Sequence, residues 1–270
     1  MFDVIKDYVD KTRNPAEQTH QLREALQIVI LRVLYDIGAF EHLTFTGGTA
    51  LRLVYKIPRY SEDLDFSLTQ RKGFNFESVY QGLVTQLTKY YGLKPDASMA
   101  AEGNVYKIEL KFSQVLWELK LAPMKNQNLF IKLEIDTQAP EGGIVALSLL
   151  PQFLSFTVSH FDLPSLFATK LHACFFRKYT KGRDVYDFIW YLARRVVPNF
   201  PLLNSTVRQT QNVDLGVNAS NFKTYLLKGI EGFDMDKAKA DIERFLINKT
   251  ELALFKKETL RNVVESLDYI

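Results

Sequence analysis

Two aspartates, Asp63 and Asp65, stand two positions apart at the start of a short apolar segment and are suited to binding a divalent cation. Successive side chains of a strand point to opposite faces, so residues two apart bring their carboxylates to the same face. Such carboxylates repel each other unless a positive charge lies between them. Hard oxygen ligands suit Mg²⁺, which takes one or two carboxylates together with phosphate oxygens. Alone, the Asp-x-Asp pattern occurs by chance on many solvated strands and turns.

A second candidate is Gly47-Gly48-Thr49, which lies between a short apolar run and the start of a helix. Glycines let the backbone approach a phosphate closely, and free N–H groups at a helix N-terminus attract anions. The Thr49 hydroxyl could bind a phosphate oxygen or cap the helix, and an ordinary glycine turn with a threonine cap is the alternative. Together the two elements predict a site where the loop holds a triphosphate and the carboxylates hold its metal ions.

Capping signals and hydrophobic periodicity indicate the elements that must position these residues. Asn14 can cap a helix that has Pro15 at its first position and Glu17 at a capping-box spacing, which predicts a helix over 15–37. Alternating or short apolar runs predict strands over 43–46, 64–68, 104–112, 129–136 and 154–159, with helices over 49–55 and 76–90.

Strand signals stop after Pro164, and only helical patterns follow. Strands early and helices late indicate an α/β (α+β) domain with a mixed sheet over 1–160 and a helical bundle over 161–270. The expected helices of the second domain cover residues 165–177, 184–196, 220–229, 235–247 and 250–267.

The composition is that of a globular protein, with 47% hydrophobic and 24% charged residues and a formal net charge of +3. The sole cysteine, Cys174, excludes an internal disulfide and a cysteine-based zinc site. We find no secretory signal and no apolar run of membrane-spanning length, which predicts a cytoplasmic protein without a membrane partner. The four histidines lack ligand spacing, and neither a GxSxG elbow nor a P-loop is present.

Basic residues gather in the second half of the chain. Such clusters beside an active site could hold an RNA backbone, and solvated helix faces explain them equally well. They are Lys178, Lys181, Arg183, Arg194, Arg195, Lys256, Lys257 and Arg261.

Three motifs resemble those of the AbiEii/AbiGii toxin family, which belongs to the DNA polymerase β-like nucleotidyltransferases. Residues 45–53 (FTGGTALRL) and 59–66 (RYSEDLDF) resemble its Gly-Gly/Ser loop and the following DxD strand. Residues 170–173 (KLHA) and 183–188 (RDVYDF) resemble its later lysine and Arg-Asp-x-x-Asp motifs. Motifs in the expected order are much more specific than any one of them.

The resemblance implies that Asp63 and Asp65 hold one or two Mg²⁺ or Mn²⁺ ions, which polarise the phosphates and the attacking hydroxyl. A third carboxylate is expected on a later strand. Glu134 and Asp136 share a face of the predicted strand 129–136, and either could complete the site. Glu134 is favoured because it lies within the run rather than at its end, and a solvated strand face is the alternative for both.

The later motifs imply further roles. Lys170 is expected to contact the nucleotide phosphates as a point charge. Asp184 and Asp187 are three apart and share a helix face, and Arg183 can pair with Asp187. One aspartate could orient Lys170 or Arg183, or act in proton transfer, and structural pairing alone is the alternative.

Two residues upstream of the DxD pair also belong to the matched motif. Ser61 and Arg59 could each touch a phosphate, and a turn after Pro58 would explain both.

The resemblance therefore implies a metal-dependent nucleotidyltransferase that moves a nucleoside monophosphate from an NTP to an acceptor hydroxyl. It further implies the toxin of a toxin–antitoxin or phage-defence system, with RNA, at the 3′ end of tRNA, as acceptor and a cognate antitoxin as partner. Two other interpretations stay open: a transferase acting on a protein or small molecule, and an interaction protein on an inactive nucleotidyltransferase scaffold.

Overall fold

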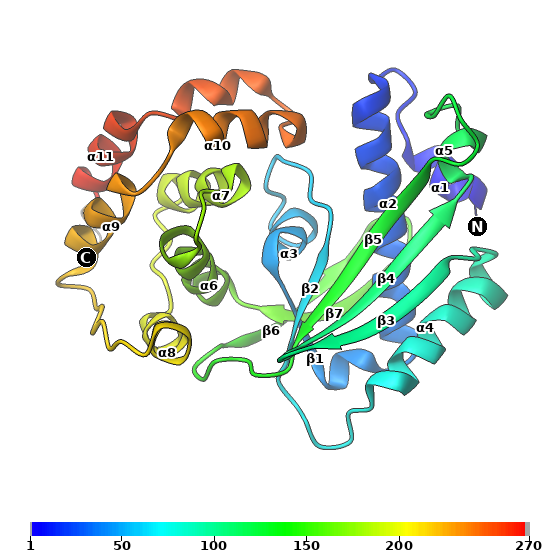
Figure 1. Cartoon of the computed structure of the whole chain (residues 1–270), viewed down its shortest axis with the longest axis horizontal. Coiled ribbons are helices and arrows are strands. Elements are labelled where there is room, and N and C mark those ends of the chain that lie inside the picture. Colours follow the sequence, from blue (N-terminus) through cyan, green and yellow to red (C-terminus); the bar gives the residue numbers. More distant parts are fainter. Residues whose placement is uncertain (1, 268–270) are drawn as a thin grey trace. The chain divides into compact units, whose positions relative to one another are not determined.

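The computed structural model describes residues 2–267 of the chain, which divide into two compact units (Figure 1). The first unit contains the chain up to Tyr55 together with Tyr60–Ala139 and Ala146–His160. The second contains the chain from Phe161 onward and two short earlier segments, Lys56–Arg59 and Pro140–Val145. Arg59 therefore belongs to the second unit although it lies four residues before Asp63.

One mixed seven-stranded sheet is recorded in the described residues. Its strands are β1 (Leu43–Thr46), β2 (Leu64–Leu68), β3 (Asp96–Glu102), β4 (Val105–Ser113), β5 (Asn128–Asp136), β6 (Val145–Leu150) and β7 (Phe156–Phe161). They lie in the order β3-β4-β5-β2-β1-β7-β6. β1 is antiparallel to β2 and parallel to β7, whereas β2 is parallel to β5. The ends of β1 and β2 that carry the two sequence motifs are therefore adjacent in the sheet.

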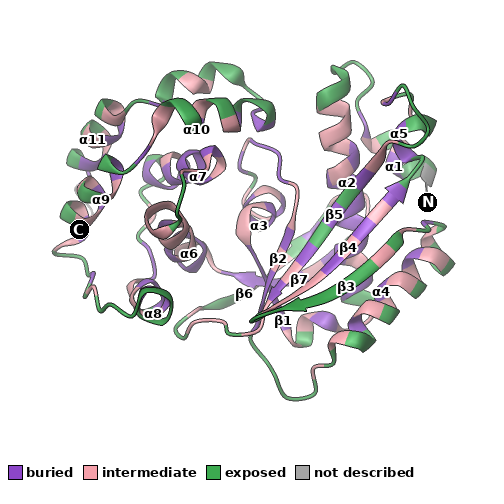
Figure 2. Ribbon diagram, viewed as in Figure 1, coloured by how far each residue is buried: buried purple, intermediate pink, exposed green. Residues whose placement is uncertain are grey.

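Helices accompany this sheet in the first unit: α1 (Phe2–Tyr8), α2 (Pro15–Asp36), the 3₁₀ helix η1 (Ala39–Glu41), α3 (Gly47–Leu53), α4 (Phe76–Tyr91) and α5 (Val115–Glu118). The side chain of Asn14 accepts a hydrogen bond of 3.0 Å from the N–H of Glu17, which caps α2 as predicted. Buried apolar residues line α2 from Leu22 to Leu34, and the helix packs against β5 and α4 (Figure 2). These contacts place α2 against both the sheet and α4.

The second unit is helical after Phe161. It contains α6 (Leu163–Phe176), α7 (Gly182–Ala193), α8 (Phe200–Gln211), α9 (Phe222–Glu231), α10 (Met235–Ile242) and α11 (Lys257–Glu265), with short 3₁₀ helices at Glu243–Phe245 and Lys249–Leu254. α6 packs against α7 and α8, and α7 packs against α10. An aromatic core ties these helices together: the Phe167 and Tyr191 rings stack with centroids 4.3 Å apart.

The predicted fold class is confirmed: a mixed α/β chain with helices in its second half. The predicted strands 43–46 and 64–68 agree with β1 and β2 at both ends. The prediction missed α1, α5, α8, β3 and β6, and β3 gave no alternation to read because nearly all of its residues are exposed. Among residues 2–267, no helix combines the length and apolarity needed to cross a lipid bilayer.

Candidate active site

The start of α3 differs from its prediction in a way that matters for the site. The helix begins at Gly47 rather than Thr49, so both glycines form its first turn instead of a loop before it. Gly47 has φ +72°, a left-handed conformation that favours glycine. A Cβ on Gly47 would lie 2.1 Å from Asp65 Oδ2, so the Asp65 carboxylate occupies the space that any other side chain would fill. Gly47 is therefore required both by its backbone and by its neighbour.

Thr49 does not present its hydroxyl to solvent. The residue is fully buried, and its Oγ1 donates to the backbone carbonyl of Asp63. The predicted cap is also absent, since Thr46 is the N-cap of α3 and makes no capping bond with its side chain. Thr49 instead joins α3 to the segment before β2 and so positions Asp63.

Parallel pairing of β2 and β5 decides which later carboxylate lies beside Asp65. Glu134 is the register partner of Asp65, and Asp136 is the partner of Ser67. Register partners on neighbouring strands project from the same face of a sheet, so Glu134 and Asp65 are side by side. Asp136 accepts a hydrogen bond of 2.8 Å from the N–H of Gln138 at the end of the strand. Geometry thus favours Glu134, although Asp63 precedes β2 by one residue and lies outside the ladder.

The carboxylates of Asp63, Asp65 and Glu134 can be compared with the ligands that a metal ion requires. Asp63, Asp65 and Glu134 are all half-buried. Within residues 2–267, no three His, Cys, Asp or Glu side chains converge closely enough to form a metal site by themselves. Mg²⁺ rarely uses such an all-protein cage, because it keeps waters and takes one or two carboxylates plus substrate phosphates. The adjacent pair Asp65 and Glu134 fits that second arrangement.

A buried contact missed by the sequence analysis holds the chain just before β2. Gln27 of α2 is 1% exposed, and its amide donates to the carbonyls of Ser61 and Glu62 at 3.3 and 2.8 Å. Ser61 is itself buried. The sequence does contain a signal for this contact, because Gln27 is a polar residue among the apolar residues of the predicted helix 15–37.

A salt bridge to α2 likewise holds α3 in position. Arg52 Nε lies 2.5 Å from Glu24 Oε2 of α2, and Glu24 also accepts from the Tyr8 hydroxyl at 2.7 Å. Burial, the largest influence, would lower the pKa of Arg52, but Glu24 outweighs it and raises that pKa. The guanidinium therefore stays charged, and α3 is tied to the helix that supports the sheet.

The second unit assembles the later motif residues into a buried ion network. Arg59 binds Asp187 through two contacts, Nε to Oδ1 at 2.5 Å and Nη2 to Oδ2 at 2.6 Å. Lys170 Nζ lies 2.9 Å from both Asp184 Oδ1 and Asp187 Oδ2. Arg177 is the last member of this series of ion pairs, with its Nη1 2.5 Å from Asp184 Oδ2. Positive and negative groups thus alternate from Arg59 to Arg177.

Burial and charge act in opposite directions in this network. The side chains of Arg59 and Asp187 are 1% and 0% exposed, and that of Lys170 is 12% exposed. Burial would lower the pKa of Lys170, but the charges of Asp184 and Asp187 outweigh it and raise that pKa. Burial would likewise raise the pKa of Asp184, but Lys170 and Arg177 outweigh it and lower that pKa. Lys170 and Asp184 are therefore ionised at neutral pH.

The positions of three predicted nucleotide contacts differ from expectation. Arg59 has its guanidinium in a buried pair rather than in an open site. The partners of Asp187 are Arg59 and Lys170, while the Arg183 guanidinium lies 4.6 Å from the centroid of the Phe245 ring. Lys170 is bound by both aspartates, a contact that fits both the orienting role and structural pairing alone.

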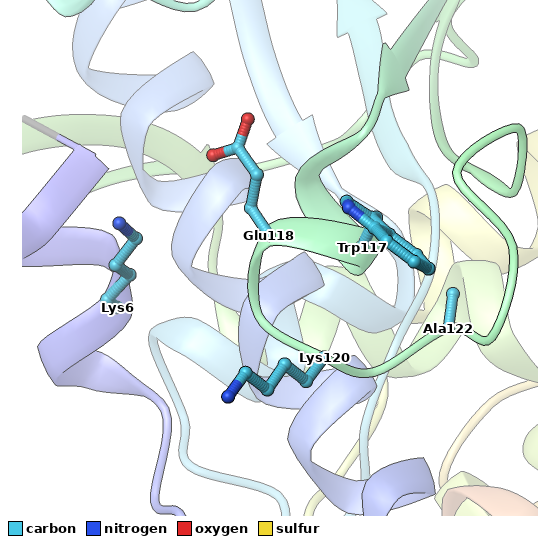
Figure 3. Close-up of a pocket in the computed structure, with 5 residues that line it drawn as sticks. All are labelled: Lys6, Trp117, Glu118, Lys120 and Ala122. Atoms are coloured by element: carbon cyan, nitrogen blue, oxygen red, sulfur yellow. The ribbon is translucent and has the colours of Figure 1, made fainter.

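A hollow elsewhere in the first unit is not part of this site. It has a volume of about 560 Å³ and is lined by Lys6, Trp117, Glu118, Lys120 and Ala122 (Figure 3). α5, which carries two of these residues, packs at the start of β5. Glu134 is six residues further along that strand, which is roughly 20 Å at the rise of an extended chain.

Comparisons with known proteins bear on the family and the fold of the chain. Over residues 29–263 the sequence matches the family described as nucleotidyl transferase AbiEii toxin, type IV TA system. The structure is similar to that of JHP933 from Helicobacter pylori, with 18% identity and a TM-score of 0.53 over 92% of this chain and 93% of that one.

A putative nucleotidyltransferase from H. pylori is also similar, with 18% identity and a TM-score of 0.52 over 91% of this chain and 95% of that one. At such identity these two structures show a shared fold alone. No match was found among curated proteins. Because the family match spans most of its length and confirms the resemblance of its motifs, the chain belongs to the AbiEii family of nucleotidyltransferase toxins of type IV toxin–antitoxin systems.

Proposed function

We propose that this protein transfers a nucleoside monophosphate from an NTP to an acceptor hydroxyl in a reaction that depends on Mg²⁺ or Mn²⁺. The observation that carries the proposal is the position of the Asp65 carboxylate, which lies against Gly47 and beside Glu134. A carboxylate pair next to the glycine turn of a helix matches the needs of a metal-bound polyphosphate. Asp65 and Glu134 are half-buried, whereas Asp184 and Asp187 of the second unit are buried.

Each residue of the first unit then has a separate task. Asp65 and Glu134 hold the metal, and Asp63, fixed through its carbonyl by Thr49, is a further ligand. Gly47 leaves room for the Asp65 carboxylate, and the resemblance assigns the phosphates to the Gly47-Gly48 turn at the start of α3. The metal, when bound, would polarise the phosphates and the acceptor hydroxyl.

The second unit contributes mainly by holding charges in place. Asp187 and Asp184 keep Lys170 charged and oriented, and Arg59 neutralises Asp187. The resemblance assigns Lys170 to the nucleotide phosphates, and 12% of its side chain is exposed. A Lys170→Met variant that folds and transfers normally would remove Lys170 from the proposal.

RNA is the proposed acceptor, with the 3′ end of tRNA as its reacting group and a cognate antitoxin as partner. The support is membership of a family of toxins from type IV toxin–antitoxin systems. Expression of the chain should then arrest growth, and co-expression of a cognate antitoxin should restore it.

The test is to incubate the protein with each α-labelled NTP, Mg²⁺ and total tRNA, and to follow label in RNA on a denaturing gel. Asp65→Ala should lower transfer at least about a hundredfold, since second-shell changes at metal sites already cost ten- to a hundredfold. Its unfolding midpoint should stay close to that of the parent. Undiminished transfer by Asp65→Ala would exclude the mechanism.

The same experiment separates the alternatives. Label that appears in protein or in a small molecule, and not in RNA, would favour a transferase with another acceptor. An absence of both transfer and metal-dependent NTP binding, measured by titration calorimetry, would favour an inactive interaction scaffold.

A further inference from the structure

A cationic hollow of about 300 Å³ lies in the second unit, beside the loop between α6 and α7. Three of its lining side chains are positively charged, Arg177, Lys178 and Lys237, whereas Asp234 is the one acid among the residues recorded there. None of these groups takes part in the proposed metal site. Lys178 belongs to the basic residues of the second half of the chain, whose positions in the sequence fit either RNA contact or a solvated surface.

The walls of this hollow are fixed by specific contacts. Asp241 accepts a hydrogen bond of 2.8 Å from the N–H of Gly182, and Thr180 Oγ1 accepts one of 3.3 Å from the N–H of Asp234. A Cβ on Gly182 would lie 2.1 Å from the carbonyl oxygen of Ala238, so α7 and α10 meet backbone to backbone. The loop that carries Lys178 is thus held against α10, which carries Lys237 in its first turn.

The charges around the hollow are only partly neutralised. Lys237 lies 3.1 Å from Asp234 but keeps 80% of its side chain exposed. Lys178 is exposed and forms no ion pair with any residue in the described part of the chain. Arg177 pairs with Asp184 from outside the lining and is 35% exposed. Concave sites lined by one sign of charge concentrate the opposite ion, so this hollow attracts anions.

We propose that the hollow is a phosphate-binding pocket and that its ligand is a phosphodiester of the RNA backbone. Its volume is at the lower end of the range for ligand pockets, which suits one sugar–phosphate unit rather than a whole cofactor. Arg177 offers a planar donor fork for phosphate oxygens, and the lysines add point charges. Tyr179, 62% exposed, supplies a ring on which a base can stack. RNA as the source of the phosphate rests on the proposed function, whereas the pocket itself does not.

The experiment measures fluorescence anisotropy of a labelled single-stranded RNA oligonucleotide with the full chain, without NTP or divalent metal. The double variant Lys178→Ala/Lys237→Ala is compared with Lys228→Ala/Lys249→Ala, which removes the same charge from exposed positions of the second unit outside the pocket lining. We expect the pocket variant to bind about tenfold more weakly. The slope of log K for RNA association against log salt should fall in magnitude by about 0.7, as expected for one lost phosphate contact.

Equal losses of RNA affinity in both double variants would contradict the proposed pocket, because they would indicate diffuse electrostatic attraction to the surface. Competition with unlabelled NTP distinguishes the two sources of phosphate. If NTP binding depends on Lys178 and Lys237 while RNA binding does not, the pocket binds a nucleotide and the proposal of RNA as its ligand is wrong. Failure of nucleotide transfer would leave this measurement unchanged, because binding is followed without the donor or the metal.

Discussion

Asp65 of β2 and Asp187 of α7 both belong to matched motifs, yet the structure surrounds them in opposite ways. Asp65 is half-buried, lies against a glycine and has another carboxylate, Glu134, as its register partner. Asp187 is fully buried between Arg59 and Lys170. Two adjacent carboxylates favour the binding of a cation, and a buried carboxylate between two cations is stabilised by their charges. The region around Asp65, called the first region, is therefore suited to chemistry. The region around Asp187, called the second region, is suited to holding helices and charges in place.

The largest expected effect is on the buried network. Asp187→Ala leaves Arg59 and Lys170 without their shared partner, and breaking such a buried pair costs about 3–5 kcal/mol. Urea unfolding should record that loss. The control is Asp214→Ala, which removes an exposed partner of Arg208 in the same unit and should cost less than about 1 kcal/mol. Equal losses in the two variants would contradict the contrast between buried and exposed pairs.

Replacement of Glu134 tests the first region without disturbing a buried pair. Glu134→Gln should lower transfer about a hundredfold, equivalent to about 2.7 kcal/mol of barrier, and leave the unfolding midpoint unchanged. Asp136→Asn, two residues along the same face, is the matched control and should transfer at nearly the parent rate, because Asp136 faces Ser67 in the ladder. The reverse pattern would assign the role to Asp136.

Gly47→Ala should displace the Asp65 carboxylate, and a misplacement of about 1 Å can cost about a hundredfold in rate. The control is Gly92→Ala at the end of α4, which has a similar φ of +67° but no atom within 4 Å of the added Cβ. Both variants should lose roughly 1 kcal/mol of stability from the backbone conformation. Only Gly47→Ala should lose nucleotide-transfer activity. Equal transfer rates in Gly47→Ala and Gly92→Ala would show that the displacement of Asp65 does not affect the reaction.

The smallest effect concerns pH. The pKa of Asp184 is lowered because Lys170 and Arg177 outweigh its burial. A carboxyl whose pKa is lower in the folded state stabilises the fold above its unfolded pKa of about 3.9, and that contribution is lost as pH falls through the folded value. Asp184→Asn should therefore be about 2 kcal/mol less stable than the parent at pH 7. The difference, followed by urea unfolding, should shrink toward pH 3, and a constant difference would exclude this origin.

Much of the first region could be predicted because its signals are local. Strand alternation and helix caps depend on neighbouring residues, so β1, β2 and the start of α2 were placed from sequence. The second region could not be predicted in the same way. Arg59 and Asp187 are 128 positions apart, and nothing in either segment identifies the other as its partner. Gln27 was missed because its partners are backbone carbonyls of a distant loop.

By itself, the sequence determined the motifs and their family, the mixed α/β class, and the presence of carboxylates at strand positions. The tertiary structure alone decided that Glu134 rather than Asp136 lies beside Asp65, because the β2–β5 register depends on how two strands pair. It also decided that Thr49 and Arg59 are buried supports. Residue type specifies which chemistry a side chain can perform, but exposure and partners, which only packing sets, determine whether it does so.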